Sequence, residues 1–515
     1  MLNENTLISK VIDFNKLDKN QIEQLMNPIE FKISDHRLFM QAEKIVLDAI
    51  KLNKKIIVCG DYDADGICST SILYYMLKKL NANVGYYIPN RFSEGYGLND
   101  NTVDLALNKG YELFILVDNG VSATSSLMKI REGNAQALIL DHHSYEGDVL
   151  CDCLVHPNLL DDHYKDMCGS GLAYNLAERL IGYDSFLVSL AGIATIADLM
   201  PLWGFNRSLV IRGLKEINTN QRQVFMSLLN SNENITETDI AFQLVPKLNA
   251  IGRLADKINV NKVVEYLCSE DHQSIDIFSK EIIRINELRK EINQKMYIRA
   301  LELITDEPVQ VLYDPMFHEG IVGITAGRLA NELKRPVFVL NQEGNRLKGS
   351  ARSYGAINLK ELVEPVSDLL NRFGGHAQAA GLELDISNIE TFKQKMFANT
   401  EVLNRHDVES NDIEMEENWF NIESFVELYK YRPFGQGFEI PSFRFNEISI
   451  LSNRIIRGGI SFDLSLFNRT ISAVYFQSTL DERLVRSNFN SIIGRVSVDN
   501  FRNQTKLKIL IESFE

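Results

Sequence analysis

Lys55-Ile56-Ile57-Val58-Cys59-Gly60-Asp61-Tyr62-Asp63-Ala64-Asp65-Gly66 is the stretch that decides the fold. Its apolar start, Lys55–Cys59, has the length and β-branched content of a buried strand. An acidic turn follows, and Gly66 lets the backbone tighten there. The amphipathic run Ser69–Leu80 then predicts a helix. Strand, turn and helix in this order predict the start of an α/β domain.

The same alternation continues as far as Asp198. Further strand-like segments lie at Val84–Ile88, Leu113–Val117 and Ala137–Leu140, with helical stretches between them. Short apolar strands separated by helices are typical of a parallel sheet that is covered on both faces. We therefore expect a parallel-sheet catalytic domain at residues 51–270, preceded by a helical cap at residues 1–50.

The rest of the chain predicts four more segments. A long, charged pattern from about Ser274 to Ile304 has few helix breakers and predicts one connecting helix at residues 271–305. A second α/β domain is expected at 306–406. The acidic stretch Asp407–Asn418 predicts a solvated linker and turn at 407–440. Short alternating strands after Pro441 predict a small β-barrel of the oligonucleotide-binding (OB) type at 441–515.

Composition limits the function. A chain of 515 residues is too long for a single core, and a net charge of −15 argues against a protein that binds nucleic acid over its whole surface. A polyanion would have to enter a locally basic groove. The 6 cysteines form no regular framework, and no apolar stretch approaches the ~20 residues that a membrane span needs. We therefore expect a cytoplasmic protein.

Acidic and histidine-bearing segments stand where the predicted strands and helices end. They are Asp61–Gly66, Val117-Asp118-Asn119, Asp141-His142-His143 and Ala197-Asp198-Leu199. A single aspartate could be a helix cap, but this many carboxylates packed together would repel one another without cations. Oxygen and imidazole donors suit Mn²⁺ or Mg²⁺. Two such ions, roughly 3.5–4 Å apart, can activate a water and stabilise a leaving oxygen, which predicts phosphoester hydrolysis.

These segments resemble a known family. Asp63-Ala64-Asp65, Asp118, Asp141-His142-His143 and Asp198 resemble the four motifs of the DHH phosphoesterase superfamily, and Gly374-Gly375-His376 with Ala379-Ala380-Gly381 is similar to the motif of its DHHA1 domain. Within the superfamily, further segments resemble the RecJ single-stranded-DNA exonucleases: Gly60–Gly66, Arg91–Gly97, Pro246–Arg253 and Gly349–Ser353. The resemblance covers about residues 35–515. It implies a DHH domain, a connecting helix, a DHHA1 domain and a terminal OB barrel.

The resemblance also implies roles for the acidic and histidine residues. One metal would be held by Asp63, Asp118 and Asp198, and the other by Asp65, Asp118 and His142, so that Asp118 bridges the two. His143 would contact the scissile phosphate, while Asp141 and Asp61 would orient the ligands. Some members of the superfamily carry a histidine where this chain has Cys59. One metal would then bind more weakly, unless the thiolate or a water fills that position.

A second set of residues is expected to bind the substrate. Arg91, Ser350 and Arg352 match what resembles the family's 5′-phosphate pocket, although an isolated arginine usually forms a surface ion pair. Arg253 would meet the threaded strand or form a salt bridge at a domain interface. Gly374, Gly375 and His376 would bring bare backbone and an imidazole to the nucleotide. His318 is interpreted as a supporting or structural residue.

The barrel carries aromatic and basic residues that could hold a single strand. They are Phe462, Phe467, Tyr475 and Phe476, with Arg454, Arg457 and Arg469. Most of these aromatic side chains are expected to fill the core, with one or two left for stacking on bases.

Together these features predict a Mn²⁺- or Mg²⁺-dependent exonuclease that degrades single-stranded DNA from the 5′ end and releases 5′-mononucleotides, in repair and recombination. We expect a monomer without membrane contact, with a helicase and a single-strand-binding protein as candidate partners. Two alternatives stay open. One is a superfamily phosphodiesterase for short oligoribonucleotides or cyclic dinucleotides. The other is a catalytically silent replication-fork scaffold, which would be expected to lack ligands.

Overall fold

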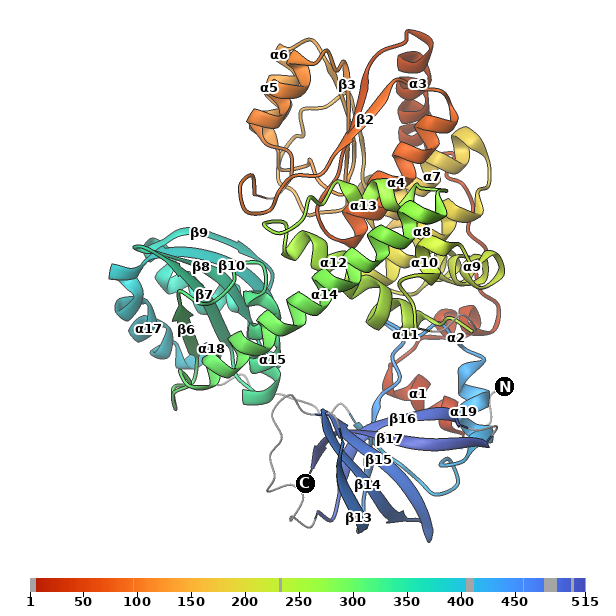
Figure 1. Cartoon of the computed structure of the whole chain (residues 1–515), viewed down its shortest axis with the longest axis vertical. Coiled ribbons are helices and arrows are strands. Elements are labelled where there is room, and N and C mark those ends of the chain that lie inside the picture. The colour runs from red at the N-terminus through yellow and green to blue at the C-terminus, as the bar shows by residue number, and fades with distance from the viewer. Residues whose placement is uncertain are drawn as a thin grey trace. The chain divides into compact units, whose positions relative to one another are not determined.

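The computed structural model describes residues 6–95, 97–230, 234–403, 412–456, 458–476, 489–501 and 504–514 (Figure 1). The chain divides into two compact units. The first unit comprises Met1–Asn249, Asn259–Ser279 and Asn411–Glu515, and the second comprises Ala250–Ile258 and Lys280–Ser410. No helix among the described residues has both the length and the apolar character needed to cross a membrane.

A five-stranded parallel sheet forms the centre of the catalytic domain in the first unit, in the order β2-β1-β3-β4-β5. Its strands are β1 (Ile56–Cys59), β2 (Val84–Tyr87), β3 (Leu113–Val117), β4 (Gln136–Leu140) and β5 (Cys153–Val155). Every residue of β1 and β3 is buried, as expected for strands covered on both faces. The predicted parallel sheet is thus confirmed.

Helices cover both faces of this sheet. One face packs against α5 (Asp100–Asn108) and α6 (Thr124–Glu132), which lie together in Figure 1. The other packs against α4 (Ala64–Lys79) and α7 (Gly169–Ile181). Helix α4 begins at Ala64, before the predicted Ser69, because Asp63 caps it: its Oδ1 accepts the amides of Asp65 and Gly66 at 3.0 and 3.1 Å.

The helical part of the first unit stands beside this sheet. It consists of α3 (Arg37–Lys51), α8 (Ser185–Ala197), α9 (Gly204–Asn220), α10 (Gln223–Met226), α11 (Glu237–Asp239), the π-helix η3 (Ile240–Leu244), the start of α12 (Val245–Arg253) and α13 (Lys262–Leu267), with short 3₁₀ turns η1 (Pro157–Leu159) and η2 (Asp162–Tyr164). The last four residues of α12, Ala250–Arg253, belong to the second unit. Helices α8 and α9 approach closely where two glycines meet: a Cβ on Gly192 would lie 3.2 Å from the Cα of Gly213.

The C-terminal sheet has seven strands in the order β11-β12-β16-β17-β15-β14-β13. They are β11 (Asp412–Glu414), β12 (Ser442–Phe445), β13 (Ser449–Ile456), β14 (Gly459–Leu466), β15 (Arg469–Phe476), β16 (Ile492–Phe501) and β17 (Gln504–Phe514), accompanied by helix α19 (Ile422–Tyr429). Alternate side chains of β14, Ile460, Phe462 and Leu464, face one apolar core. This arrangement agrees with the predicted terminal barrel.

The predicted solvated linker is not what the structure shows over its described part. From Asp412 onward the segment pairs with β12, and Met415, Trp419 and Phe420 are buried in the core of the barrel. The average composition of the segment is acidic, so it does not reveal the few apolar residues. Burial of these apolar side chains makes the segment part of the barrel. Residues 407–411 of the predicted linker lie outside the described residues.

The helices of the expected N-terminal cap pack in two different parts of the first unit. Helix α1 (Leu7–Phe14) buries Leu7, Ile8, Val11 and Ile12 in the barrel core, and α2 (Lys19–Met26) adds Leu25. Helix α3 instead packs on β5 and α7. The apolar stripe of α1 requires a partner surface, and its sequence alone does not name one.

The second unit contains the predicted second α/β domain. The predicted connecting helix is α14 (His272–Leu301), and the sheet that follows has the order β6-β7-β8-β10-β9. Its strands are β6 (Gln310–Asp314), β7 (Val337–Glu343), β8 (Arg346–Arg352), β9 (Leu370–Gly375) and β10 (Ala379–Asp385). Its helices are α15 (Val322–Leu333), α16 (Leu359–Val363), α17 (Ile389–Phe397) and α18 (Thr400–Leu403), with 3₁₀ turns η4 (Glu364–Leu369) and η5 (Ile386–Asn388). Helix α15 packs on β7 and β8.

Candidate metal centre and substrate site

The carboxyl ends of the parallel strands bring the acidic motifs together. Asp118 follows β3, His142 follows β4, and Asp198 ends α8. The Nε2 of His142 lies 3.1 Å from Asp118 Oδ1, 3.4 Å from Asp198 Oδ2 and 3.8 Å from Asp65 Oδ2. Four of the five predicted metal ligands therefore share one cluster around a single imidazole.

Potential ligand atoms fall into three groups, each within 4.8 Å. They are Asp118 with His142 and His143, Asp65 with His142 and Asp198, and Asp61 with Asp63 and Asp118. Asp118 belongs to two of the groups, as a bridging ligand would. Asp198 accompanies Asp65 and His142 instead of Asp63, and Asp61 is a further candidate ligand. The assignment of ligands to each ion stays a prediction.

Burial and mutual repulsion raise the pKa of four carboxyl groups in these sets, those of Asp61, Asp63, Asp118 and Asp198. Burial is the largest cause for Asp118, followed by the charges of Asp65 and Asp63, and its pKa lies well above the ordinary value. The same two causes raise the pKa of Asp61 and Asp63, and that of Asp198 to about 8. Divalent cations would relieve this repulsion and favour the ionised forms.

Two buried oxygens in the cluster also fit a metal. Asp61 Oδ1 and Asp198 Oδ2 accept no hydrogen bond from any described residue. Buried oxygens usually have partners, and a bound cation would supply the missing partner beside these histidine and carboxylate donors. Oxygen with imidazole nitrogen is a donor set that Mn²⁺ accepts readily. The residues present therefore fit two divalent ions.

Asp65 is held by the first turn of α7. Its Oδ2 accepts the amide of Gly169 and its Oδ1 accepts the amide of Ser170, both at 2.8 Å. The positive end of the helix stabilises the carboxylate there. A Cβ on Gly169 would lie 2.8 Å from the Cβ of Asp118, so glycine is required. Our sequence analysis missed Gly169 and Ser170, although the small residues of Cys168–Gly171 were a usable signal.

Asp141 orients His143. Its Oδ1 accepts the backbone amides of His142 and His143 at 2.8 and 3.2 Å and lies 2.8 Å from His143 Nδ1, while its Oδ2 accepts the amide of Val121 at 3.1 Å. Burial would lower the pKa of His143, but the hydrogen bond and charge of Asp141 outweigh it and raise the pKa to about 9. The His143 side chain is 42% exposed. A charged, accessible imidazolium can contact a phosphate.

The turns that carry these ligands are fixed by residues we did not single out. Asp118 has a left-handed backbone with φ 58°, a strained conformation of the kind found at functional sites. Asn119 Nδ2 donates to the carbonyls of Cys59 and Val117 at 3.1 and 2.9 Å. Asn249 Oδ1 accepts the amide of Ala64 at 2.8 Å, and His156 Nε2 lies 3.0 Å from the carbonyl of His143.

Cys59, considered above as a possible ligand, is buried at the end of β1. It belongs to none of the ligand groups found among the described residues. Burial raises the pKa of its thiol to about 12.

Arg91 lies beside the cluster of candidate metal ligands in the first unit. Its guanidinium stands over the ring of Tyr62, 5.2 Å from the centroid. Its charge lowers the pKa of Asp61, although burial of Asp61 and the charge of Asp63 act more strongly in the opposite direction. No ion pair joins Arg91 to a carboxylate within the described part of the chain. Arg91 is therefore available to an anionic ligand.

Three other predicted substrate residues gather at the N-terminus of α15 in the second unit. Arg253 Nη1 makes a long hydrogen bond of 3.5 Å to the carbonyl of Gly320. A Cβ on Gly323 would lie 3.0 Å from Arg352 Nη2 and 3.4 Å from Ser350 Oγ. Bare backbone at a helix N-terminus, with a guanidinium and a hydroxyl beside it, suits a phosphate.

His318 stands in the loop that leads into α15. Its Nδ1 accepts the amide of Gly320 at 3.1 Å, and its Nε2 lies 3.4 Å from Asp256 Oδ1. Both contacts stay within the second unit, so the geometry agrees with the interpretation of His318 as a supporting residue.

The glycine motif lies in the same sheet as Ser350. Across β8, β10 and β9, Ser350 pairs with Gly381 and Gly381 with Gly374, so the three share one row and one face. Gly375 has φ 147°, and a Cβ there would lie 2.4 Å from the carbonyl of Ala379. His376 is exposed in the turn that follows. The row offers bare backbone to a ligand.

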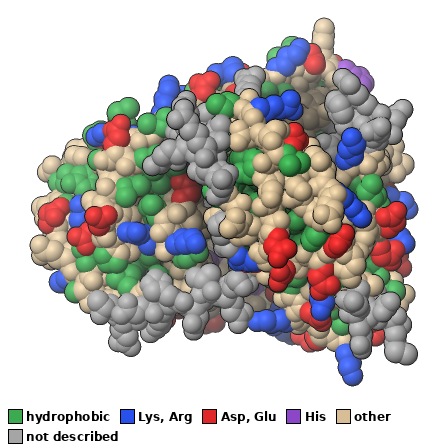
Figure 2. Space-filling view, turned by 90° about the horizontal axis from the view of Figure 1, so that it is seen from below, with side chains coloured by type: hydrophobic (Ala, Val, Ile, Leu, Met, Phe, Trp, Pro, Cys, Tyr) green, Lys and Arg blue, Asp and Glu red, His purple; other side chains and the backbone are tan. Residues whose placement is uncertain are grey.

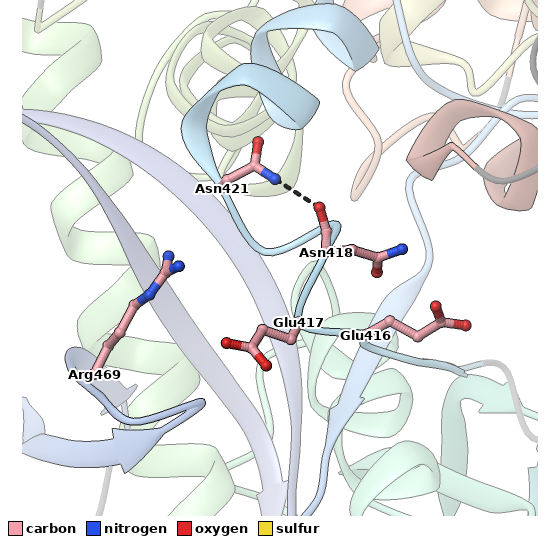
Figure 3. Close-up of a pocket in the computed structure, with 5 residues that line it drawn as sticks. All are labelled: Glu416, Glu417, Asn418, Asn421 and Arg469. Atoms are coloured by element: carbon pink, nitrogen blue, oxygen red, sulfur yellow. Dashed lines mark hydrogen bonds between the residues drawn. The ribbon is translucent and has the colours of Figure 1, made fainter.

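Most of the four barrel aromatics singled out from the sequence pack in the core, as expected. Phe462 is buried, Phe467 and Tyr475 pack against the core, and Phe476 is 62% exposed. Arg469 lines a pocket with Glu416, Glu417, Asn418 and Asn421 (Figure 3), where the acidic side chains oppose phosphate binding. Arg457 lies outside the described residues. In Figure 2 basic side chains are scattered among acidic ones, without a broad basic surface among the atoms described in that view.

Three family models match the chain. They are the DHH family N-terminal domain at residues 55–200, the DHHA1 domain at 306–401 and the RecJ OB domain at 411–513. The last begins within the expected linker, in agreement with the buried residues found there.

Curated relatives and a solved structure are similar over most of the chain. The single-stranded-DNA-specific exonuclease RecJ of Haemophilus influenzae is 30% identical over 92% of this chain and 90% of the relative. That of Bacillus subtilis is 31% identical over 92% of this chain, which spans 62% of the relative's length. The crystal structure of Thermus thermophilus RecJ in complex with Mn²⁺ is 26% identical, with a TM-score of 0.82, and covers 99% of this chain and 76% of that one.

Proposed function

This chain belongs to the RecJ family of single-stranded-DNA-specific exonucleases, and from that premise we propose that it degrades single-stranded DNA from the 5′ end and releases 5′-mononucleotides. The observation that supports this proposal best is the cluster of Asp65, Asp118, His142 and Asp198 at the strand ends. Mn²⁺ or Mg²⁺ held there would supply an activated water and neutralise charge on the phosphate.

The protein's own residues would bind and orient the strand. His143, held by Asp141, would donate a hydrogen bond to the scissile phosphate. Arg91, Ser350 and Arg352 would hold the terminal 5′-phosphate, with Arg253 against the adjoining backbone. Gly374, Gly375 and His376 would lie against the terminal nucleotide. A terminal phosphate fixed in this way makes the reaction start at an end.

The cellular setting is part of the proposal. All six cysteines are unpaired, which supports a reducing compartment such as the cytoplasm. We propose that the enzyme acts as a monomer in DNA repair and recombination. Because it takes single strands, a helicase and a single-strand-binding protein are the partners that would supply and hold its substrate.

Incubation of end-labelled DNA tests the proposal directly. Single-stranded and duplex DNA, labelled at either end, are incubated with and without Mn²⁺. A 5′ label should appear first as a mononucleotide, only from single strands and only with metal. Release of a 3′ label first, or equal cleavage of duplex DNA, would contradict the proposed polarity or substrate.

The two alternatives predict different outcomes. A phosphodiesterase for dinucleotides would prefer very short RNA or cyclic dinucleotides to long DNA, and the match to a RecJ OB domain at residues 411–513 disfavours it. A silent scaffold would have lost ligands, whereas every expected carboxylate is present and most lie within one cluster. Metal titration in the presence of a long single strand separates binding from hydrolysis.

A further inference from the structure

The loop between β2 and α5 is organised around one carboxylate, that of Glu94. Its Oε1 accepts the hydroxyl of Tyr87 at 2.5 Å, the hydroxyl of Thr102 at 3.1 Å and the side-chain amide of Asn99 at 3.4 Å. Its Oε2 accepts the backbone amide of Asn90 at 2.7 Å. Four donors from a strand, a loop and a helix thus converge on a half-buried side chain that belongs to none of the candidate metal-ligand groups and forms no ion pair among the described residues.

These bonds fix the backbone on both sides of Arg91. The backbone amide of Asn90 donates to the Glu94 carboxylate, and the carbonyl of Asn90 accepts the amide of Glu94 at 2.9 Å. The Oδ1 of Asn90 accepts the amide of Phe92, also at 2.9 Å. Arg91 therefore projects from a closed turn. That turn faces the metal cluster, because the Arg91 guanidinium covers the ring of Tyr62 in the Asp61–Gly66 motif.

The charge state of Glu94 agrees with this arrangement. Burial would raise its pKa, but the hydrogen bonds from Tyr87, Asn90, Thr102 and Asn99 outweigh burial and lower it. The group is therefore an ionised acceptor at neutral pH, and charge-assisted hydrogen bonds of this kind are stronger than neutral ones.

We propose that Glu94 is a positioning residue that holds Arg91 ready for the 5′-phosphate of the substrate. The inference rests on the proposed function and adds to it a determinant of end recognition outside the phosphate-binding residues themselves. A flexible arginine loses side-chain and backbone freedom when it binds phosphate. A loop that is already ordered has lost that freedom on folding, so binding becomes tighter.

The test compares 5′-phosphorylated and 5′-hydroxyl single strands as substrates of the full chain with Mn²⁺. Glu94→Ala should raise KM for the phosphorylated strand by about tenfold or more, with a smaller change in kcat, and the preference for the phosphorylated strand should fall toward that of Arg91→Ala. In the double variant the two losses should not multiply, because both act on one contact. Mn²⁺ binding should be unchanged.

Milder variants and a matched control keep the test decisive if Glu94→Ala folds poorly. Tyr87→Phe and Thr102→Val each remove one donor and should lower the preference by smaller steps. Asp100→Asn should leave the preference unchanged, because that carboxylate also accepts two serine hydroxyls, at 2.7 and 2.8 Å, but does not bond to the Arg91 turn.

Two results would overturn the inference. One is an unchanged preference in Glu94→Ala, Tyr87→Phe and Thr102→Val. The other is a wild-type enzyme that digests single strands without regard to a 5′-phosphate. Neither result contradicts the exonuclease activity itself, whereas a wild-type protein inactive on single-stranded DNA would refute the proposed function.

Discussion

Asp118 occupies the most constrained position in the metal cluster. Its backbone is left-handed, its carboxylate belongs to two of the ligand groups, and the first turn of α7 packs against its Cβ. Each of these three features restricts the side chain only in part, but together they leave it one geometry. A residue under this much constraint is expected to be essential for the reaction and not for folding.

We expect Asp118→Asn to reduce single-strand hydrolysis by about a thousandfold or more, because loss of one ionised ligand removes several kcal/mol of transition-state stabilisation. Hydrolysis of a labelled strand and Mn²⁺ binding by calorimetry measure the effect. Asp104→Asn is the matched control, since Asp104 is exposed and Lys129 is its only ion-pair partner among the described residues. Full activity of Asp118→Asn would rule out the bridging role.

Repulsion among the carboxylates predicts that Asp198, a candidate metal ligand, lowers the stability of the metal-free protein. Without metal and at neutral pH, Asp198→Asn should raise the melting temperature, because burial and the neighbouring carboxylates disfavour the ionised form of Asp198 and raise its pKa to about 8, a penalty on folding that an amide does not incur. Added Mn²⁺ should stabilise the wild type more than this variant, and each 1 kcal/mol corresponds to about 1 °C for a chain of this size. Calorimetric melts in EDTA and in Mn²⁺ test both statements. A lower metal-free melting temperature in the variant would argue against repulsion.

The thiols of Cys151 and Cys153 should stay unreactive in the folded protein near neutral pH. Burial, with a smaller contribution from Asp152, raises the pKa of Cys151 to about 11. Burial, with smaller contributions from the Cys151 thiol and Asp152, raises the pKa of Cys153 to about 12. The reactive thiolate is the deprotonated form, so alkylation should become faster only as the pH rises toward those values. Mass spectrometry after iodoacetamide treatment at pH 7, 8 and 9 measures the rate of alkylation, with urea-unfolded protein as the control. Rapid labelling of the native protein at pH 7 would contradict the prediction.

Among the elements, the start of α7 has the clearest effect on the site. Its first two amides hold Asp65, and its first residue touches Asp118. The helix thus joins two metal ligands that lie in different strand-end turns. Small changes in the position of its first turn would move both.

Gly169→Ala should lower activity by about a hundredfold and weaken Mn²⁺ binding, because the added methyl would have to displace the Cβ of Asp118, 2.8 Å away. Thermal melting shows whether the fold survives. Gly327→Ala in α15 is the control for stability, since its Cβ would make an ordinary contact at 3.7 Å and should stabilise the helix by about 0.5–1 kcal/mol. Unchanged metal binding in Gly169→Ala would show that the helix can shift freely.

At the scale of the whole molecule, segments that are far apart in the sequence share one hydrophobic core. Helix α1, near the start of the sequence, packs in the core of the C-terminal barrel. In the same unit Arg207, which is 2% exposed, donates to the carbonyls of Pro433 and Tyr431 at 2.8 and 2.6 Å and lies over the ring of Phe438. One buried guanidinium thereby ties α9 to the turn before the barrel.

Arg207→Met should lower the free energy of unfolding by about 3 kcal/mol, because it leaves two buried carbonyls without donors. Urea unfolding followed by fluorescence measures the change. Arg212→Met is the control and should change stability by less than about 0.5 kcal/mol, since Arg212 pairs with Glu30, whose side chain is 79% exposed. Equal effects of the two substitutions would show that burial of Arg207 does not matter.

The sequence by itself determined the parallel sheet, the connecting helix and the meeting of the acidic motifs. Strands Ile56–Cys59, Leu113–Val117 and Gln136–Leu140 are parallel, so residues that follow them must come to one edge, and a local pattern is enough to predict this. The family resemblance added the family itself, which the comparisons confirm, whereas the roles that it implies for individual residues stay predictions.

Only the tertiary structure decided which neighbours hold those residues. The amides of Gly169 and Ser170 on Asp65, Asn249 on Ala64, and the four donors on Glu94 join segments that local periodicity does not relate. The burial of α1 and of Met415 in the barrel is of the same kind. Periodicity reports which face of a segment seeks burial, whereas its partner is selected by the packing and hydrogen bonding of the whole chain.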